Sequence, residues 1–217
     1  MKSRIFLLLF FLFAAGDLVN VWMDLPYRYL TKSLIIPALV LYFVSISPRK
    51  KSYQLLLIAL FFAWLGDVFL LFTGKNFFLL GLGSFLLMQI LYSAIFYKNR
   101  KISKGKLAIS ILVLGLFCAG FNYYLYPFTT AIRIPVIAYS IAIAIMALTG
   151  INRDNELAGY NHVFFGVLLF VISDTVLAFN SFGPGFWKGG FWVMLTYILA
   201  QYCIVEGYGK HLRSSIQ

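Results

Sequence analysis

Charged residues are scarce in this chain. Of its 217 residues only 12% are charged and seven are acidic, whereas 62% are hydrophobic. Soluble domains rarely exceed about 50% apolar residues. The composition therefore excludes a water-soluble globular protein and predicts an integral membrane protein.

Cysteine and histidine are also few. Cys118 and Cys203 lie in apolar stretches with no spacing motif, so we expect small core residues and no disulfide bond. His162 and His211 stand far from the acids of the apolar stretches, which argues against a multi-histidine zinc site and a Ser-His dyad. The chain has no phosphate-cradling loop and no dinucleotide fingerprint. The sequence thus predicts a protein that works without a metal or an organic cofactor.

The long apolar stretches predict the fold. They run for about 20 residues, the length of a membrane-spanning helix, and do not alternate like the strands of a barrel. In lipid, backbone polar groups are satisfied by helices or closed barrels. We predict an all-α, polytopic membrane bundle of eight transmembrane helices that forms a single domain over residues 1–217. The expected spans are 5–22, 28–47, 53–72, 77–97, 107–126, 132–150, 158–180 and 190–208.

The first span has a second interpretation. Basic Lys2 and Arg4, the apolar run after them and the small residues Ala14 and Ala15 are typical of a signal peptide with its cleavage site. The apolar stretch resumes at Leu18, which favours a helix that is retained.

The net charge of +11 predicts membrane topology rather than nucleic-acid binding, because the basic residues form short clusters between apolar spans. With the N-terminus inside, thirteen Lys and Arg residues fall on the inner side and five on the outer side. Cytoplasmic segments carry the excess, so both termini are predicted to face the cytoplasm, in a bacterial inner membrane or its equivalent. The inner residues are Lys2, Arg4, Arg49, Lys50, Lys51, Lys98, Arg100, Lys101, Lys104, Lys106, Arg153, Lys210 and Arg213. The outer residues are Arg28, Lys32, Lys75, Arg133 and Lys188.

Two intramembrane acids stand at matching places. The segment LGDVFLLF at 65–72 returns as ISDTVLAF at 172–179, an offset of 107 residues that aligns Asp67 with Asp174. The offset skips four helices, so it predicts two parallel four-helix repeats, 1–102 and 103–217. An ionised Asp within lipid costs about 2.5–3.5 kcal/mol, which makes each acid a candidate for function. The alternative to a repeat is a chance match between two apolar segments. The alternative to a functional role is a structural ion pair with Lys32 that holds helices together.

Other polar side chains are predicted at membrane depths close to those of the two acids. Gln89 and Tyr92, three residues apart, share one helix face, and so do Tyr197 and Gln201, four residues apart. We expect the acids and these side chains to line one cavity, with one carboxyl group protonated and the other ionised, which allows acid and base catalysis. The candidate catalytic residues are Asp67 and Asp174, and the candidate substrate-binding residues are Lys32, Gln89, Tyr92, Tyr139, Tyr197 and Gln201.

At these residues the sequence resembles the lysoplasmalogenase family, the YhhN-like integral membrane proteins. The order and spacing of the matching residues carry the resemblance over most of the chain. They are Lys32, Gly66-Asp67, Gly81-Leu82-Gly83-Ser84-Phe85, Tyr92, Pro135-Val136, Tyr139, Met146, Ser173-Asp174, Tyr197 and Gln201.

Two positions depart from the family pattern. Ser33 stands where the family has proline, and Gln89 stands where it often has histidine. Because an amide cannot titrate, the second departure removes any proton-transfer role from that position.

The resemblance implies hydrolysis of the vinyl ether bond of lysoplasmalogens, which gives a fatty aldehyde and glycerophospho-ethanolamine or -choline. It implies Asp67 and Asp174 as the acid and base, in an order the sequence does not assign, and a single-chain ether phospholipid as the partner. A proton-coupled transporter and a lipid-binding membrane protein are the alternatives that the repeated acids leave open.

Overall fold

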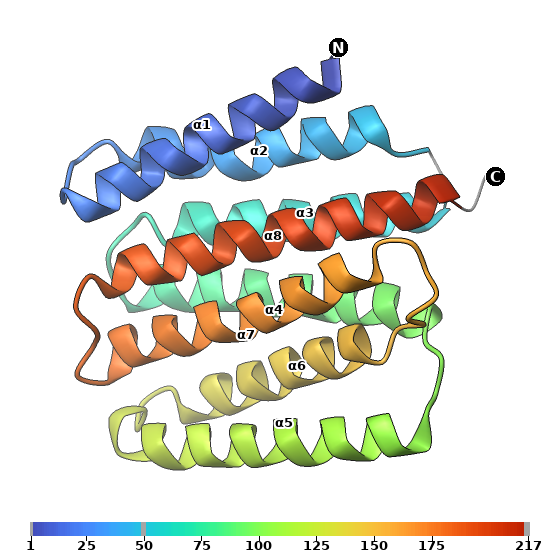
Figure 1. Ribbon diagram of the computed structural model, residues 1–217. Coiled ribbons are helices and arrows are strands. Elements are labelled where there is room, and N and C mark those ends of the chain that lie inside the picture. Colours follow the sequence, from blue (N-terminus) through green and yellow to red (C-terminus); the bar gives the residue numbers. More distant parts are fainter. Residues whose placement is uncertain (1, 49–50, 215–217) are drawn as a thin grey trace.

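The computed structural model describes residues 2–48 and 51–214 (Figure 1), with side chains from residue 53 onward in the second range. Arg49 and Lys50, two of the residues counted for topology, lie outside the described residues. Eight α-helices and one 3-10 turn make up the described part of the chain. They are α1 (Lys2–Trp22), α2 (Arg28–Ile46), α3 (Lys51–Phe69), α4 (Lys75–Lys98), α5 (Lys104–Leu125), η1 (Tyr126–Phe128), α6 (Arg133–Ile151), α7 (Tyr160–Phe182) and α8 (Gly189–Ser214).

The predicted all-α bundle is confirmed. Within the described residues, seven of the helices are long and apolar enough to span a membrane, and α3 has a shorter apolar stretch, Tyr53–Phe69. The protein is therefore a multi-pass membrane protein. Most expected bounds differ from the observed ones by a few residues, whereas α8 continues six residues beyond the predicted end at 208.

The extension of α8 has a local cause. Glu206, two residues before the predicted end, is buried and accepts a hydrogen bond from Tyr42 of α2 at 2.6 Å. Lys210 and Arg213, the next basic residues on the same helix, lie 3.7 and 3.3 Å from its carboxylate. These contacts stabilise another turn and a half of helix that hydropathy alone does not predict.

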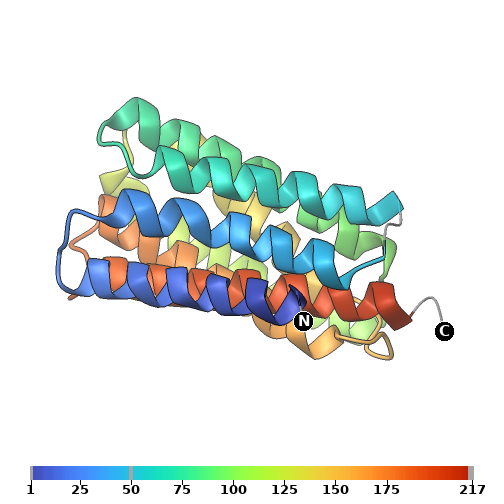
Figure 2. The same ribbon diagram turned by 90° about the horizontal axis from the view of Figure 1, so that it is seen from above.

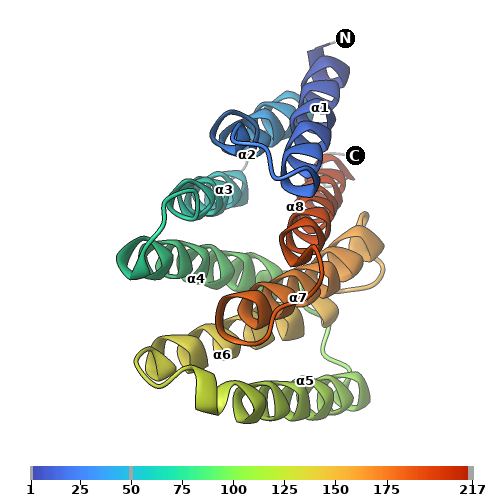
Figure 3. The same ribbon diagram turned by 90° about the vertical axis from the view of Figure 1, so that its left-hand side faces the viewer.

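Successive helices run in opposite directions, so both termini lie at one end of the bundle (Figure 1). We call this the terminal end and the opposite one the distal end. In the end-on view of Figure 3, α2, α3 and α4 form one side and α1, α8 and α7 the other, with α6 and α5 beyond them. Seen from above, α1 lies along α8 (Figure 2). Which end faces the cytoplasm stays a prediction.

Helix α5 lies at the edge of the bundle. It packs mainly against α6, and only 6% of its apolar window is buried, against 22–50% for the other long apolar helices of the described chain. Its ring contacts with α7 are made by Phe121 and Tyr124, which lie 6.1 and 5.0 Å from Phe179. α5 is therefore the helix least held by protein contacts.

Small residues let the central helices approach closely. In α7, Gly166 faces α8, and a methyl group there would lie 2.8 Å from the side chain of Ile204. Gly159, just before α7, has φ +78° and lies directly against the backbone of Gly207 in α8. Close helix packing in membranes relies on such positions, and here it holds the start of α7 against the second half of α8.

The loops of the terminal end are tied together by charged residues. Arg100 and Arg153 pair their backbones, and the nearby Lys101 Nζ donates to Glu156 at 2.7 Å. That hydrogen bond raises the pKa of Lys101. Arg153 is 1% exposed, and burial lowers the pKa of its guanidinium to about 10.

Candidate functional site

Asp67 lies near the distal end of α3 and is 2% exposed. Tyr197 of α8 donates its hydroxyl to Asp67 Oδ2 at 2.7 Å. Lys32 of α2 places Nζ 3.5 Å from Asp67 Oδ1. We call these three residues the Asp67 cluster. Lys32 is turned inward to an ion pair and does not extend to the membrane surface.

The neighbours of Asp67 explain how the cluster is held. Gly66 has the ring of Phe85 against its Cα, since an added methyl group would lie 2.9 Å from that ring. Phe85 in turn packs edge-on against the ring of Tyr197 at 5.9 Å, and Phe170 of α7 does the same at 5.7 Å. Rings on both α4 and α7 therefore orient the tyrosine that binds Asp67.

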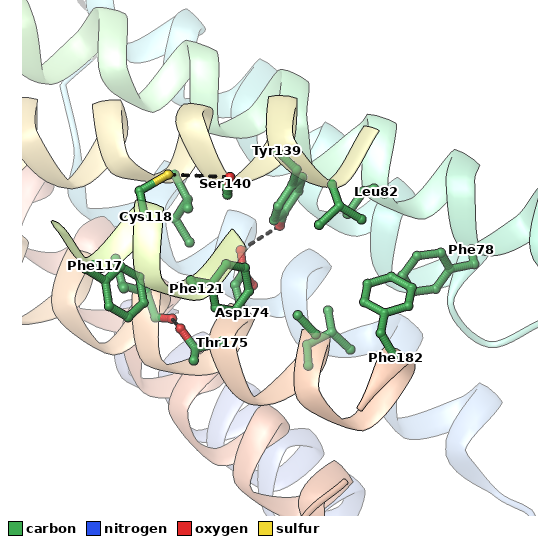
Figure 4. Close-up of a pocket in the computed structure, with 15 residues that line it drawn as sticks. Phe78, Leu82, Phe117, Cys118, Phe121, Tyr139, Ser140, Asp174, Thr175 and Phe182 are labelled. Carbon is green, nitrogen blue, oxygen red and sulfur yellow. Dashed lines mark hydrogen bonds between the residues drawn. The ribbon is translucent and has the colours of Figure 1, made fainter. Parts of the chain in front are cut away.

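Asp174 has a different set of partners. Tyr139 of α6 donates to Asp174 Oδ2 at 2.6 Å, and Gln89 of α4 donates Nε2 to the same oxygen at 3.0 Å. Asp174 Oδ1 accepts no hydrogen bond from the described residues. We call these three residues the Asp174 cluster, and Figure 4 shows Tyr139 and Asp174 pointing toward one another. Unlike Asp67, Asp174 is bound by neutral donors.

A third contact joins α4 to α8 and involves one residue from each pair that was predicted to share a helix face. The hydroxyl of Tyr92, 0% exposed, donates to Gln201 Oε1 at 2.6 Å. Gln201 Nε2 contacts Met88 Sδ at 3.4 Å. Tyr92 and Gln201 therefore bind each other, and within the described residues neither forms a hydrogen bond to Asp67 or Asp174.

The two acids do not share hydrogen-bond partners in the described part of the chain, and Asp67 lines neither of the two cavities described below. Within the described residues, no hydrogen-bond donor serves both Asp67 and Asp174. The reason is helix packing: α3 carries Asp67 toward α2 and α8, whereas α7 carries Asp174 toward α4 and α6. The two acids thus have chemically unequal surroundings, one with a cation and one without.

Asp174 lies on the wall of a narrow, mostly apolar cavity between α4, α5, α6 and α7, which we call the inner cavity. Its volume is about 40 Å³, room for a few water-sized molecules. Phe78 and Phe182 lie together at one end of it (Figure 4), with ring centroids 5.4 Å apart. The full lining is Phe78, Leu82, Phe117, Cys118, Phe121, Val136, Tyr139, Ser140, Ile143, Val171, Asp174, Thr175, Leu177, Ala178 and Phe182.

A second cavity of about 320 Å³ lies nearer the distal end, and we call it the mouth cavity. Arg28, Lys32 and Asn180 give it a polar side. Phe78 and Leu177 line both cavities, so the two adjoin. A cationic chamber therefore stands beside an apolar one, with Asp174 on the wall of the latter.

Polar residues outside the eight candidate residues also lie near the cavities. Asn122 donates to Ser140 at 2.8 Å beside the inner cavity, and its partner Cys118 lies four residues earlier on α5. Asp17 in α1, 0% exposed, lies 3.5 Å from Arg28. The rule that intramembrane acids mark functional positions identifies Asp17, whereas an asparagine or serine in an apolar helix carries no comparable signal.

No three His, Cys, Asp or Glu residues gather closely enough to hold a metal ion within residues 2–48 and 51–214. The chemistry that these clusters offer is proton transfer and hydrogen bonding by carboxyl, phenol and amide groups.

Comparison of the chain with models of known protein families identifies its family. The YhhN family model matches residues 27–208, which include all eight candidate site residues. The chain belongs to the YhhN family. No curated protein and no solved structure matches the chain. Helix α1 precedes the region that the YhhN model matches.

The two departures from the YhhN pattern can now be placed. Gln89, where the family often has histidine, donates to Asp174, so the amide serves as a fixed hydrogen-bond donor. Ser33, where the family has proline, donates its hydroxyl to the backbone carbonyl of Tyr29 one turn earlier on α2. Neither Gln89 nor Ser33 contributes a side chain to the Asp67 cluster.

Replacing Lys32 by methionine is expected to destabilise the protein by about 3–5 kcal/mol, because Asp67 then remains buried without its cation. The melting temperature of the purified protein measures the loss. Adding Asp67→Asn to the variant should recover most of it.

Lys188→Met is the matched control, since it removes a lysine whose partner Asp24 is 81% exposed in its side chain. An exposed pair contributes about 1 kcal/mol or less. Equal losses in Lys32→Met and Lys188→Met would contradict the assignment of Lys32 and Asp67 as a buried pair.

Proposed function

We propose that this protein hydrolyses the vinyl ether bond of lysoplasmalogens. The observation that carries the proposal is Asp174, held by Tyr139 and Gln89 on the wall of an apolar cavity that adjoins a cationic one. A single-chain ether phospholipid has the same order of parts: a charged headgroup, then the ether, then an apolar chain. Membership of the YhhN family supports the same choice of substrate.

The chemistry requires one well-placed acid. A vinyl ether hydrolyses when a proton adds to the alkene carbon remote from oxygen, which leaves an oxocarbenium ion on the carbon bonded to oxygen. Asp174 is our candidate donor, because both its hydrogen bonds go to Oδ2 and leave Oδ1 for a proton and for the substrate. A positioned general acid accelerates such a step by about 10²–10⁴-fold.

The same carboxyl group can complete the reaction. After giving up its proton, the Asp174 carboxylate stabilises the cation and takes a proton from the water that attacks it, which forms a hemiacetal. Returning that proton to the ether oxygen breaks the carbon–oxygen bond and releases the glycerol hydroxyl. The hemiacetal hydroxyl proton passes to the Asp174 carboxylate as the aldehyde forms, which restores the acid form of Asp174, so one water is consumed and no proton is gained or lost overall.

Asp67 has a different part in this proposal. Its ion pair with Lys32 holds the ammonium group at the mouth cavity, where a headgroup phosphate would bind. Tyr197, donating to Asp67, fixes the carboxylate. Tyr92 and Gln201 join α4 to α8 and keep Gln89 and Tyr197 in register. The two acids therefore divide the work: Asp174 transfers protons and Asp67 positions a cation.

The test is product formation by the purified protein. Incubation with lysoplasmenyl-choline or -ethanolamine should release a fatty aldehyde, and the acyl lysophospholipid of the same chain length should release none. Aldehyde is measured by its reaction with a hydrazine reagent. If well-folded protein releases no aldehyde from either vinyl ether lipid, the proposal is wrong.

A proton-coupled carrier is the second candidate, favoured by the buried pair of Lys32 and Asp67 and by the matching acidic segments. It predicts substrate movement across sealed vesicles without any new product. Aldehyde release without net flux would exclude it.

A further inference from the structure

The mouth cavity offers hydrogen-bond donors and no acids. Arg28 and Lys32 of α2 and Asn180 of α7 line it, and none of the lining residues in the described chain is Asp or Glu. Lys32 is 5% exposed, so its ammonium group is largely shielded from bulk solvent. A chamber with this lining selects for an anion.

One of these donors lacks a partner. Asn180 Nδ2 is a buried nitrogen atom without a hydrogen bond in the described part of the chain, whereas Arg28 Nε faces Asp17 Oδ1 at 3.5 Å. Buried donors such as Asn180 Nδ2 are nearly always satisfied, so its lack of an acceptor points to a ligand that supplies one. Asn180 lines the same cavity as Arg28 and Lys32.

The orientation of Asn180 is held by the loop between α7 and α8. Asn180 Oδ1 accepts the backbone N–H of Phe186 at 2.8 Å, so the amide presents Nδ2 as its free group. Gly189 leaves space for this amide, since a methyl group at residue 189 would lie 2.1 Å from Asn180 Nδ2. The loop thus positions the side chain as a donor.

The acids that balance the cations do not line the cavity. Asp67 pairs with Lys32, and Asp17 of α1 lies 3.5 Å from Arg28. Neither acid is a lining residue of the mouth cavity. Each cation is therefore positioned by a carboxylate from behind while its remaining N–H groups are available to a ligand. Asp17 is also bound by the Thr31 hydroxyl at 3.1 Å, which fixes it in place.

We propose that the mouth cavity is a phosphate-binding site in which Arg28, Lys32 and Asn180 contact the phosphate oxygens and Asp17 positions Arg28. Phosphate suits the site because its several oxygens can accept from all three side chains at once, and because arginine binds it in a planar fork. A volume of about 320 Å³ accommodates the group. The shared walls with the inner cavity favour a phosphate that carries a single chain, and this choice of ligand rests on the proposed function.

Binding measurements in a phosphate-free maltoside detergent test the site. The probes are an acyl lysophosphatidylcholine, which has no vinyl ether to cleave, the monoacylglycerol of the same chain, and inorganic phosphate. The wild type is expected to bind the lysophospholipid at least about tenfold more tightly than the monoacylglycerol, because charge-assisted hydrogen bonds form only to the former. Equal affinities would overturn the proposal.

Two variants test the residues. Asn180→Asp keeps the oxygen that accepts from Phe186 but places negative charge in the cavity, and Arg28→Gln removes the guanidinium. Each should reduce the preference for the lysophospholipid about tenfold or more, and Asp17→Asn should reduce it less. If both Asn180→Asp and Arg28→Gln fold and keep the full preference, the site is assigned wrongly.

Arg133→Gln is the matched control. Arg133 also lies at the distal end, but it stacks on Tyr126 at 3.6 Å and does not line the mouth cavity. This variant should keep the wild-type preference, and a loss equal to that of Arg28→Gln would contradict the proposal.

The remaining measurements distinguish free phosphate from phosphate carried by a lipid. They also test the phosphate site and the hydrolase activity separately. Competition by inorganic phosphate, lost in Asn180→Asp, would extend the site to free phosphate, and its absence would assign the site to phosphate borne by lipid. Both results support a phosphate site. A protein that shows the preference but releases no aldehyde from vinyl ether lipids refutes the hydrolase alone. Aldehyde release without the preference refutes the phosphate site alone.

Discussion

Asp174→Asn is expected to lower the rate of aldehyde release from lysoplasmenyl lipids by about 10²–10⁴-fold, because an amide cannot donate the proton that starts the reaction. The fold should survive, since an asparagine oxygen can still accept from Tyr139 and Gln89. The measurement is initial aldehyde release per mole of protein, with the melting temperature taken on the same sample.

Glu156→Gln serves as the control, because this acid lies in an exposed loop at the terminal end with a side chain 75% exposed. It should keep full activity. Near-normal turnover in Asp174→Asn would remove Asp174 from the mechanism. Asp67→Asn gives the complementary result: we expect mainly a raised KM, and a loss of kcat as deep as that of Asp174→Asn would make Asp67 a second acid or base.

The largest effect on the fold is expected for Gly159→Ala. Gly159 has φ +78°, a conformation that costs a residue with a side chain about 1–3 kcal/mol. The added methyl group would also lie 2.1 Å from the carbonyl oxygen of Gly207, and overpacking of this kind costs about 1–3 kcal/mol more. Backbone atoms cannot rotate away, so α7 and α8 must separate. A strongly lowered melting temperature and poor yield should follow.

Substitutions at two other glycines separate the cost of the positive φ from the cost of the contact with α8. Gly74→Ala places a methyl group at φ +117° with no atom within 4 Å, so it tests backbone strain alone. Gly120→Ala, inside α5 with equally open space, tests neither and should be neutral or slightly stabilising. If Gly159→Ala melts no lower than Gly74→Ala, the contact between α7 and α8 is not the constraint inferred here.

Most of the architecture could be predicted because lipid imposes a simple requirement on the sequence. Eight runs of about 20 apolar residues predict eight helices, and the structure has them. The end of α8 could not be found in this way, because the residues after 208 are mostly polar, whereas the contacts of Glu206 with Tyr42 and Arg213 stabilise the helix there. The division into two four-helix repeats stays a prediction.

The site could be predicted as a set of residues but not as a set of contacts. Intramembrane acids are costly, so Asp67 and Asp174 stand out in any apolar helix. Their partners depend on which helices are neighbours: Tyr197 reaches Asp67 and Tyr139 reaches Asp174 only in this arrangement. The sequence predicted acids in unequal surroundings but not which acid has the cation, and the structure places Lys32 beside Asp67.

The loose packing of α5 has a consequence for how the proposed substrate would arrive. Phe117, Cys118 and Phe121 of this helix form one wall of the inner cavity, and among the described residues α5 has few protein neighbours besides α6. Moving it sideways would open the cavity directly to the surrounding hydrocarbon. In the hydrolase that we propose, the alkenyl tail would then enter from the bilayer and reach Asp174 without leaving the membrane for water.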